Sequence, residues 1–178
     1  MNLSKLLSTK EREIILNELL YKKGPINVAD FAKSLKLSKG FISRYFTLLS
    51  KQKIIKKSKK KYVICDNLNV RLLRILFNLI QFSTLNFKKY PFVKGAGLYG
   101  SCVKGDNIEE SDIDIWIKIE TRNEEKLARF TSDLKKRFRK ISPLYLTKEK
   151  LEVLKKEDLL FYYSLVFGSI KLYGEDIV

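Results

Sequence analysis

The sequence has no histidine, only two cysteines and a single tryptophan among its 178 residues. The lack of histidine excludes zinc sites of the Cys2His2 kind, Ser-His-Asp hydrolysis and any histidine general base. Cys65 and Cys102 stand far apart with no Cys-x-x-Cys spacing, so a disulfide-stapled scaffold is excluded as well. The longest apolar stretch, residues 68–82, contains two arginines and is shorter than the roughly 18–20 residues that a membrane span needs.

No secretory signal peptide is predicted, because the N-terminus lacks both a long apolar segment and a cleavage site. Apolar residues make up 45% of the chain, which is enough for a packed core, and 31% are charged. These features predict a basic, globular, cytoplasmic protein without a membrane partner.

The positive charge is large and is concentrated near the N-terminus. The net charge is +16, from 36 Lys and Arg against 20 Asp and Glu. Residues 1–65 hold 16 of the basic and 4 of the acidic residues, and seven of the eleven residues 51–61 are lysine. A localised excess is typical of a surface that binds nucleic acid or anionic lipid. The asymmetry therefore predicts two domains with different roles.

Three helices are predicted in the first 52 residues. Apolar residues recur at helical spacing in residues 10–22, which end before a Gly-Pro pair. Asn27 is a suitable N-cap for a second helix, residues 28–35, and Ser38 for a third helix that continues to about residue 52. The buried face of the third helix is expected to contain Ile42, Phe46 and Leu49. Its outward face carries Lys39, Gly40, Ser43, Arg44 and Thr47.

A small hairpin is expected next, because two short apolar runs, 54–55 and 62–64, flank a segment rich in lysine. Three helices followed by a basic hairpin resemble a winged helix-turn-helix over residues 9–65. The resemblance implies that residues 1–65 bind duplex DNA, with the third helix in the major groove and the hairpin on flanking phosphates. The expected contacts are Ser38, Lys39, Ser43, Arg44, Thr47, Lys56, Lys57, Lys59, Lys60 and Lys61. Merely solvated lysines, a basic membrane surface and a protein-docking domain remain alternatives.

A strongly apolar helix is predicted in a connecting segment, residues 66–89. Asp66 and Asn67 can cap it, and ten of the fifteen residues 68–82 are apolar. A surface helix shows one apolar stripe, so this helix is expected to be buried on more than one side. It either packs inside the molecule or forms the interface of a homodimer, a state in which winged-helix proteins commonly bind DNA.

Glycines cluster between the next two strand candidates. Half of the eight glycines fall within residues 95–105, and the second candidate is residues 113–117. Gly100 lets the backbone approach a ligand closely. Ser101 offers its hydroxyl and the free amides of a following helix to phosphate groups.

Two aspartates accompany this turn. Asp112 and Asp114 are two residues apart, so on a strand both carboxylates lie on one face. Adjacent carboxylates repel each other unless they share a cation. Oxygen ligands without histidine or cysteine suit Mg²⁺ or Mn²⁺. Phosphate-binding groups beside such a pair indicate phosphoryl or nucleotidyl transfer.

A Gly-Ser pair, a short helix and then Ser111-Asp112-Ile113-Asp114 on a strand resemble the minimal nucleotidyltransferases of the DNA polymerase β superfamily. The resemblance spans residues 90–178 and includes the tail 167–174. It implies that the catalytic Asp112 and Asp114 hold Mg²⁺ (or Mn²⁺) against the triphosphate of ATP or another NTP. The nucleotide-binding residues that it implies are Gly100, Ser101 and Ser111. An acceptor hydroxyl would attack the α-phosphorus and release pyrophosphate.

One catalytic element of that family is missing from its expected place. Members usually carry a third carboxylate on the next strand, but the predicted strand 139–147 contains no acidic residue. Leu144 or a neighbour stands where the aspartate is expected. Asp133 lies inside the predicted helix 124–138, and Glu149 follows the strand.

Two functions fit the sequence. The first is Mg²⁺-dependent transfer of AMP to a protein or other hydroxyl acceptor. Small members of the family act as antitoxins of a HEPN-type toxin, and a fused DNA-binding domain would then repress the shared operon. The second is a DNA-binding regulator whose nucleotidyltransferase fold senses a nucleotide or serves assembly. An RNA-modifying enzyme is a third class, for which the sequence offers no aromatic stacking platform.

The fold expected overall is α+β: an N-terminal winged helix, a connecting hydrophobic helix, and a nucleotidyltransferase-like mixed sheet with packed helices at residues 90–178. Cys102, Trp116, Tyr162 and Tyr163 are expected in its core.

Overall fold

The computed structural model describes residues 1–120 and 122–178, which form two compact units. The first unit comprises Met1–Phe77 together with Asn107–Glu110. The second comprises Asn78–Asp106 and Ser111–Val178. The chain thus leaves the first unit, returns to it for four residues, and leaves it again.

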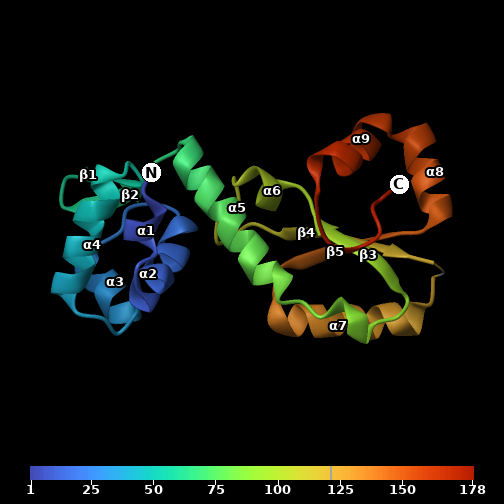
Figure 1. Ribbon diagram of the computed structural model, residues 1–178, viewed down its shortest axis with the longest axis horizontal. Helices are drawn as coiled ribbons and strands as arrows, with labels where there is room; N and C mark the ends of the chain where they lie inside the picture. Colours follow the sequence, from blue (N-terminus) through green and yellow to red (C-terminus); the bar gives the residue numbers. More distant parts are fainter. Residues whose placement is uncertain (121) are drawn as a thin grey trace. The chain divides into compact units, whose positions relative to one another are not determined.

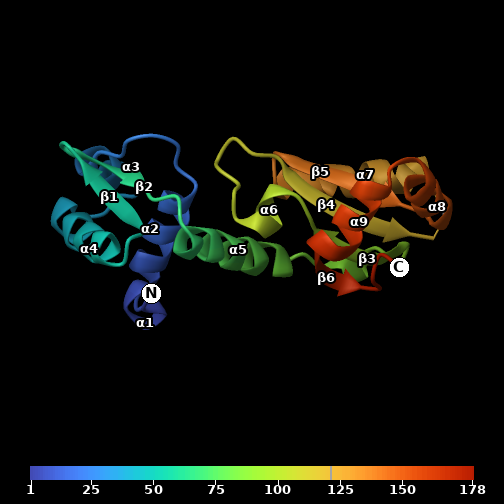
Figure 2. The ribbon, with the colours of Figure 1, turned by 90° about the horizontal axis from the view of Figure 1, so that it is seen from above.

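The first unit is built from short helices and one hairpin (Figures 1 and 2). Side-chain oxygens of Thr9, Asn27 and Ser38 accept hydrogen bonds from first-turn amides of three helices, so the caps expected at Asn27 and Ser38 are confirmed. The elements are α1 (Leu3–Leu6), α2 (Lys10–Leu20), α3 (Val28–Ser34), α4 (Lys39–Lys51), β1 (Ile55–Ser58), β2 (Lys61–Ile64) and the first part of α5 (Leu68–Ser83).

The hairpin follows α4, as expected. β1 and β2 pair antiparallel, with Ile55 opposite Ile64 and Ser58 opposite Lys61. An isolated bridge between Ile26 and Tyr62 joins β2 to the segment that connects α2 and α3. Two backbone hydrogen bonds between Ile26 and Tyr62 therefore tie the hairpin to the segment that precedes α3.

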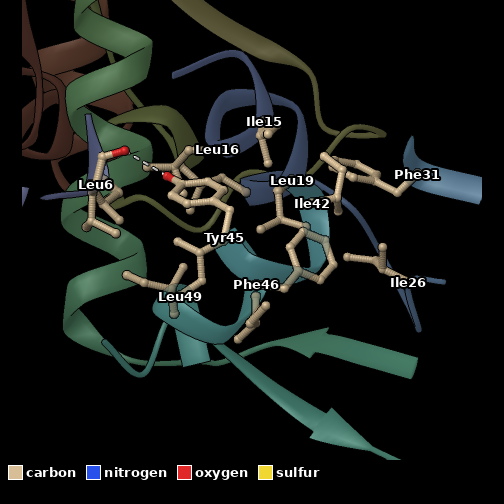
Figure 3. Close-up of a cluster of buried hydrophobic side chains, with 14 of the residues drawn as sticks. Leu6, Ile15, Leu16, Leu19, Ile26, Phe31, Ile42, Tyr45, Phe46 and Leu49 are labelled. Carbon is tan, nitrogen blue, oxygen red and sulfur yellow. Dashed lines mark hydrogen bonds between the residues drawn. The ribbon is translucent and has the colours of Figure 1, made fainter. Parts of the chain in front are cut away.

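The core of the first unit contains aliphatic and aromatic side chains, many of them from α2 and α4 (Figure 3). Ile42, Phe46 and Leu49 are fully buried, as the helical spacing predicted. Tyr45 is buried as well, and its hydroxyl donates a hydrogen bond to the carbonyl of Leu6 at 2.8 Å. Burial raises the pKa of this phenol. The short helix α1, which the sequence analysis did not predict, is thereby joined to α4.

Helix α5 contributes to the cores of both units. Val70, Leu73 and Phe77 are buried in the first core, and Phe82 is buried in the second. Internal packing therefore accounts for much of its apolar character. The side chains that it leaves exposed include Leu68, Leu72 and Ile80.

The second unit is a four-stranded mixed sheet with helices on both faces. The strand order is β5-β4-β3-β6, in which β4 and β5 are parallel and the other neighbours are antiparallel (Figure 2). The strands are β3 (Val93–Leu98), β4 (Ile113–Ile119), β5 (Ile141–Leu146) and β6 (Ile170–Gly174). The helices are η1 (Phe87–Lys89), α6 (Ser101–Lys104), α7 (Glu124–Arg137), α8 (Lys148–Glu157) and α9 (Leu159–Gly168). The α+β class is confirmed.

The alternation of β4 separates two hydrophobic layers. Ile115 and Ile117 pack in the cluster that includes Phe130 of α7. Trp116 points to the other face and packs in the cluster that includes Leu165 of α9. Figure 1 shows α7 on one side of the sheet and α8 and α9 on the other.

Three of the four residues that were expected in the core of the second unit are buried, and the exception lies on α9. Cys102, Trp116 and Tyr162 are buried, as predicted, but Tyr163 is 46% exposed. Its expected place in the core is therefore wrong. The helix packs through the side that carries Tyr162 and Leu165, and Tyr163 lies on the opposite side.

In the part of the chain that the structure describes, no helix combines the length and the apolar character needed to span a membrane.

Candidate active site

The turn between β3 and α6 brings the backbone against an aspartate. Gly100 has φ +68° and ψ −141°, a conformation open to glycine but strained for other residues. A Cβ atom placed on Gly100 would overlap Asp114 Oδ2 and lie 3.2 Å from its Cγ. Glycine is therefore required here both by conformation and by space. Ser101, the next residue, begins α6.

Asp112 and Asp114 lie at the start of β4. Asp112 is exposed and immediately precedes the strand, whereas Asp114 is its second residue and is partly buried. The backbone N–H of Tyr99 donates to the carbonyl of Asp114 at 3.1 Å, which ties the aspartate to the end of β3. Ile113 and Ile115 face the α7 layer, so the carboxylate of Asp114 faces the other side of the sheet.

Two negative charges lie close together at this site and raise each other's electrostatic energy. Burial, and secondarily the charge of Asp112, raise the pKa of Asp114. Burial and the nearby Asp114 carboxylate raise the pKa of Cys102 to about 11, so this thiol is protonated near neutral pH and is a poor nucleophile. The pKa of Tyr99 is raised for the same two reasons. A cation bound by the two aspartates would relieve this repulsion.

The donor set fits a hard cation. The Asp114 carboxylate lies against the Gly100 backbone with the charge of Asp112 nearby, and oxygen is the preferred ligand of Mg²⁺ and Mn²⁺. Within residues 1–120 and 122–178, no group of three or more His, Cys, Asp or Glu side chains is placed to hold a metal. The protein therefore offers two carboxylates at this site.

The neighbouring strand supplies no third acid. In the parallel register of β4 and β5, Ser142 stands opposite Asp114 and Leu144 opposite Trp116. Asp133 lies on α7, on the other face of the sheet, where Tyr90 Oη donates to its Oδ2 at 2.7 Å and lowers the pKa of its carboxyl.

Glu149 is also badly placed to complete the pair. It lies in the first turn of α8, after Leu146, and Leu146 pairs with Lys118 near the far end of β4. Lys118 is four residue steps along the strand from Asp114, about 13 Å at roughly 3.3 Å per residue. Neither acid named in the sequence analysis reaches the position beside Asp114.

Asn78 on α5 holds helix α6, which follows the Gly100 turn, and was missed by the sequence analysis. It is only 3% exposed, and its Nδ2 donates to the carbonyl of Cys102 in α6 at 2.8 Å. A polar residue within a strongly apolar helix needs a partner when it is buried. A polar residue within this apolar run was the signal in the sequence that could have identified Asn78. Through this bond Asn78 holds α6, the helix that begins at Ser101.

The segment between α6 and β4 returns to the first unit. Glu109 and Glu110 form ion pairs with Lys22 and Lys23 at 2.8 and 3.3 Å, and the Glu109 N–H donates to the carbonyl of Tyr21. Ser111, the remaining residue expected to bind nucleotide, follows this segment and belongs to the second unit. The five predicted site residues thus lie in the second unit, on the β3–α6 turn and at the start of β4.

The residues expected to contact DNA all lie in the first unit. Those on and before α4 are exposed, namely Ser38, Lys39, Ser43, Arg44 and Thr47. The hairpin residues Lys56, Lys57, Lys59, Lys60 and Lys61 are exposed as well. No ion pair found within residues 1–120 and 122–178 involves these five lysines, so their charge is available to an anionic partner.

A separate cavity lies at the other end of the sheet. It has a volume of about 620 Å³ and is lined in part by Lys94, Lys118 and Leu151. Lys94 pairs with Glu120 and Lys118 with Glu175, so both of these lysines are compensated by acids of the same cavity. Neither Asp112 nor Asp114 lines this cavity.

The comparison with protein families covers this part of the chain. Residues 84–177 match the family described as Polymerase beta, Nucleotidyltransferase. The match covers more than half of the 178 residues, and the chain therefore belongs to this family. The matched range contains the Gly100 turn and both aspartates, and its class of chemistry is nucleotidyl transfer. No curated protein matches the chain.

Proposed function

We propose that this member of the polymerase β nucleotidyltransferase family transfers AMP from ATP, or the nucleotide of another NTP, to a hydroxyl of a protein or other acceptor. The observation that carries the proposal is the contact of the Gly100 backbone with Asp114, beside Ser101 and Asp112. It brings the β3–α6 turn, whose groups are suited to phosphate binding, next to a carboxylate at the start of β4.

Each residue has a defined part. Asp112 and Asp114 would hold Mg²⁺ or Mn²⁺, which when bound neutralises charge on the triphosphate and at the reacting phosphorus. Ser101 and the amides that follow Gly100 would bind the terminal phosphates, with Ser111 at the edge of the same site. The acceptor oxygen bonds to the α-phosphorus, the bond to the pyrophosphate oxygen breaks, and the hydroxyl proton leaves.

The lack of an acid on β5 sets an expectation for the rate. A general base contributes about 10²–10⁴-fold to catalysis, and here Ser142 and Leu144 occupy the positions where such a group would stand. We expect nucleotide binding with slow transfer. The alternative is a regulator that senses a nucleotide, or uses the fold for assembly, without turnover.

The first unit supports a DNA-binding role. Three helices followed by an antiparallel hairpin have the order of a winged helix-turn-helix, and the exposed lysines lie on that hairpin. We propose that α4 enters the major groove of duplex DNA and that the hairpin contacts phosphates. A cytoplasmic antitoxin that binds a HEPN-type toxin and represses its own operon would use both units. Support for that role comes from the family resemblance.

The first experiment measures ATP binding by calorimetry with and without Mg²⁺. The wild type is compared with Asp112→Ala/Asp114→Ala and with the control Glu149→Ala/Glu152→Ala, which removes two exposed acids of α8. We expect metal-dependent binding in the wild type and the control, and its loss in the site variant. Transfer of labelled AMP to a candidate acceptor then tests catalysis. Wild type that fails to bind ATP would leave the DNA-binding regulator as the function.

A second experiment tests the DNA-binding surface by the salt dependence of duplex binding. Replacing Lys59, Lys60 and Lys61 by alanine should flatten the log–log salt slope by about 0.9 for each phosphate that the variant no longer neutralises. Arg44→Ala should instead lower the ratio of specific to non-specific affinity. An unchanged ratio would remove Arg44 from the surface that reads bases.

A further inference from the structure

Helix α9 presents an apolar face to solvent. Leu160 is 86% exposed and Phe167 is 80% exposed, and they flank the half-exposed Tyr163 at helical spacing. The ring planes of Tyr163 and Phe167 stack at 19° with centroids 5.7 Å apart. We call Leu159, Leu160, Tyr163, Ser164 and Phe167 the α9 stripe.

The stripe is unusual for this chain because it carries no charge. No Asp, Glu, Lys or Arg occurs in residues 159–168, although 31% of the chain is charged. At about 200 Å² for each large side chain, the exposed parts of the stripe come to about 500 Å². A monomer's largest apolar patch is typically about 300–600 Å² and often functional.

We infer that a second copy of this chain covers the stripe, with the two α9 helices packed antiparallel across a two-fold axis. The spacing of the stripe is self-complementary. With the axis between Tyr163 and Ser164, Leu160 lies opposite Phe167 of the partner subunit. Tyr163 then lies over Ser164 of the partner subunit, so a large side chain meets a small one at the centre.

The polar group at the centre is already satisfied. The hydroxyl of Ser164 donates to the carbonyl of Phe161 at 2.8 Å, so burying it leaves no unpaired donor. The contact is also uncharged, which matters because each copy carries a net charge of +16. The charges that repel the two copies therefore lie outside the contact itself, and salt screens the repulsion between them. Two stripes bury about 1,000 Å², near the lower limit for a specific interface, which predicts a weak dimer.

Helix α5 supplies a control surface. The sequence analysis left it as an alternative dimer interface, and Leu68, Leu72 and Ile80 are exposed on it. The exposed Arg71 lies one helical turn from Leu68 and next to Leu72, whereas the α9 stripe carries no charge. The inference thus assigns the dimer contact to α9 and leaves α5 to internal packing.

The test is sedimentation equilibrium of the full-length chain over a range of micromolar concentrations, at about 0.1 M and about 0.5 M salt. The wild type should form dimers, more tightly at higher salt. Leu160→Glu should weaken the dimer at least about tenfold, whereas Leu72→Glu on α5 should leave it unchanged. Both positions are exposed, so circular dichroism melting should show both variants folded.

Ser164→Phe distinguishes a dimer with the proposed register from non-specific hydrophobic association. The change adds apolar surface, so non-specific association would increase. In the proposed register the new ring meets Tyr163 of the partner subunit, and the dimer should weaken. A monomeric wild type, a dimer that Leu160→Glu leaves intact, or a tighter dimer with Ser164→Phe would each overturn the inference. ATP binding is measured on the same samples, so failure of the proposed activity is recognised separately.

Discussion

Replacing Gly100 by alanine is the sharpest test of the candidate active site, because the structure forbids the new methyl group in two ways. Its φ of +68° with ψ −141° costs a non-glycine residue about 1–3 kcal/mol. The methyl group would also overlap Asp114 Oδ2, so the carboxylate must move away from the turn. We expect Gly100→Ala to lose about 2 kcal/mol of unfolding free energy or more, and to lose metal-dependent ATP binding.

The assay is urea unfolding followed by the fluorescence of Trp116, the only tryptophan, which is buried in the second unit. With a slope of about 2 kcal/mol/M, a loss of 2 kcal/mol lowers the midpoint by about 1 M. Gly168→Ala is the matched control, since a Cβ there has nothing within 4 Å and φ is not in the left-handed region. That change should be neutral or stabilise by up to about 1 kcal/mol. A Gly100→Ala protein with the wild-type midpoint and wild-type ATP affinity would refute the described geometry of the site.

Three further changes have defined outcomes. Asp114 has a raised pKa, so the folded state holds its proton more tightly than the unfolded chain, and the resulting penalty grows as pH rises above the ordinary carboxyl value of 3.8. Asp114→Asn should therefore unfold at a higher urea concentration than the wild type at pH 7, but not in acid. The same change should abolish metal-dependent ATP binding. Equal urea midpoints at pH 7 would contradict the stability prediction. Asn78→Ala removes the donor to the α6 carbonyl and should cost about 1–3 kcal/mol in urea titrations, whereas the exposed Ile80→Ala should cost clearly less. Tyr45→Phe leaves a carbonyl of α1 unpaired and should lower stability by about 1 kcal/mol in thermal melts, and an unchanged melting temperature would argue against that hydrogen bond.

Much of the secondary structure could be predicted because local signals and tertiary packing agree. Asn27 and Ser38 cap the helices that they were expected to cap, and the apolar spacing of α4 identified Ile42, Phe46 and Leu49 as buried. The sequence pattern did not predict the burial of Tyr45, because its hydroxyl bonds to a carbonyl that is 39 residues away in the chain. A local pattern holds no information on such a partner.

In the candidate site, too, residue spacing predicts some features, whereas others depend on tertiary structure. The Gly-Ser pair and the two aspartates were singled out by residue type and spacing; the structure brings Gly100 against Asp114, and the binding of phosphate and a cation there stays a prediction. The overlap between a Cβ at Gly100 and Asp114 depends on the register of β3 and β4, which spacing does not determine. The register of β5 likewise places Ser142, rather than Leu144, opposite Asp114. Tyr163 was misplaced because an apolar helix gives no sign of which side faces the sheet.

The return of Asn107–Glu110 to the first unit has a consequence for the order of assembly during synthesis. Domains commonly fold from the N-terminus while the chain is still being made. The hydrophobic core of the first unit is complete once Phe77 has been made. The ion pairs that Lys22 and Lys23 form with Glu109 and Glu110 must wait until those two acids appear. A nascent chain therefore acquires the core of its first unit well before Glu109 and Glu110, and until then Lys22 has only Glu18 as an acidic partner among these pairs.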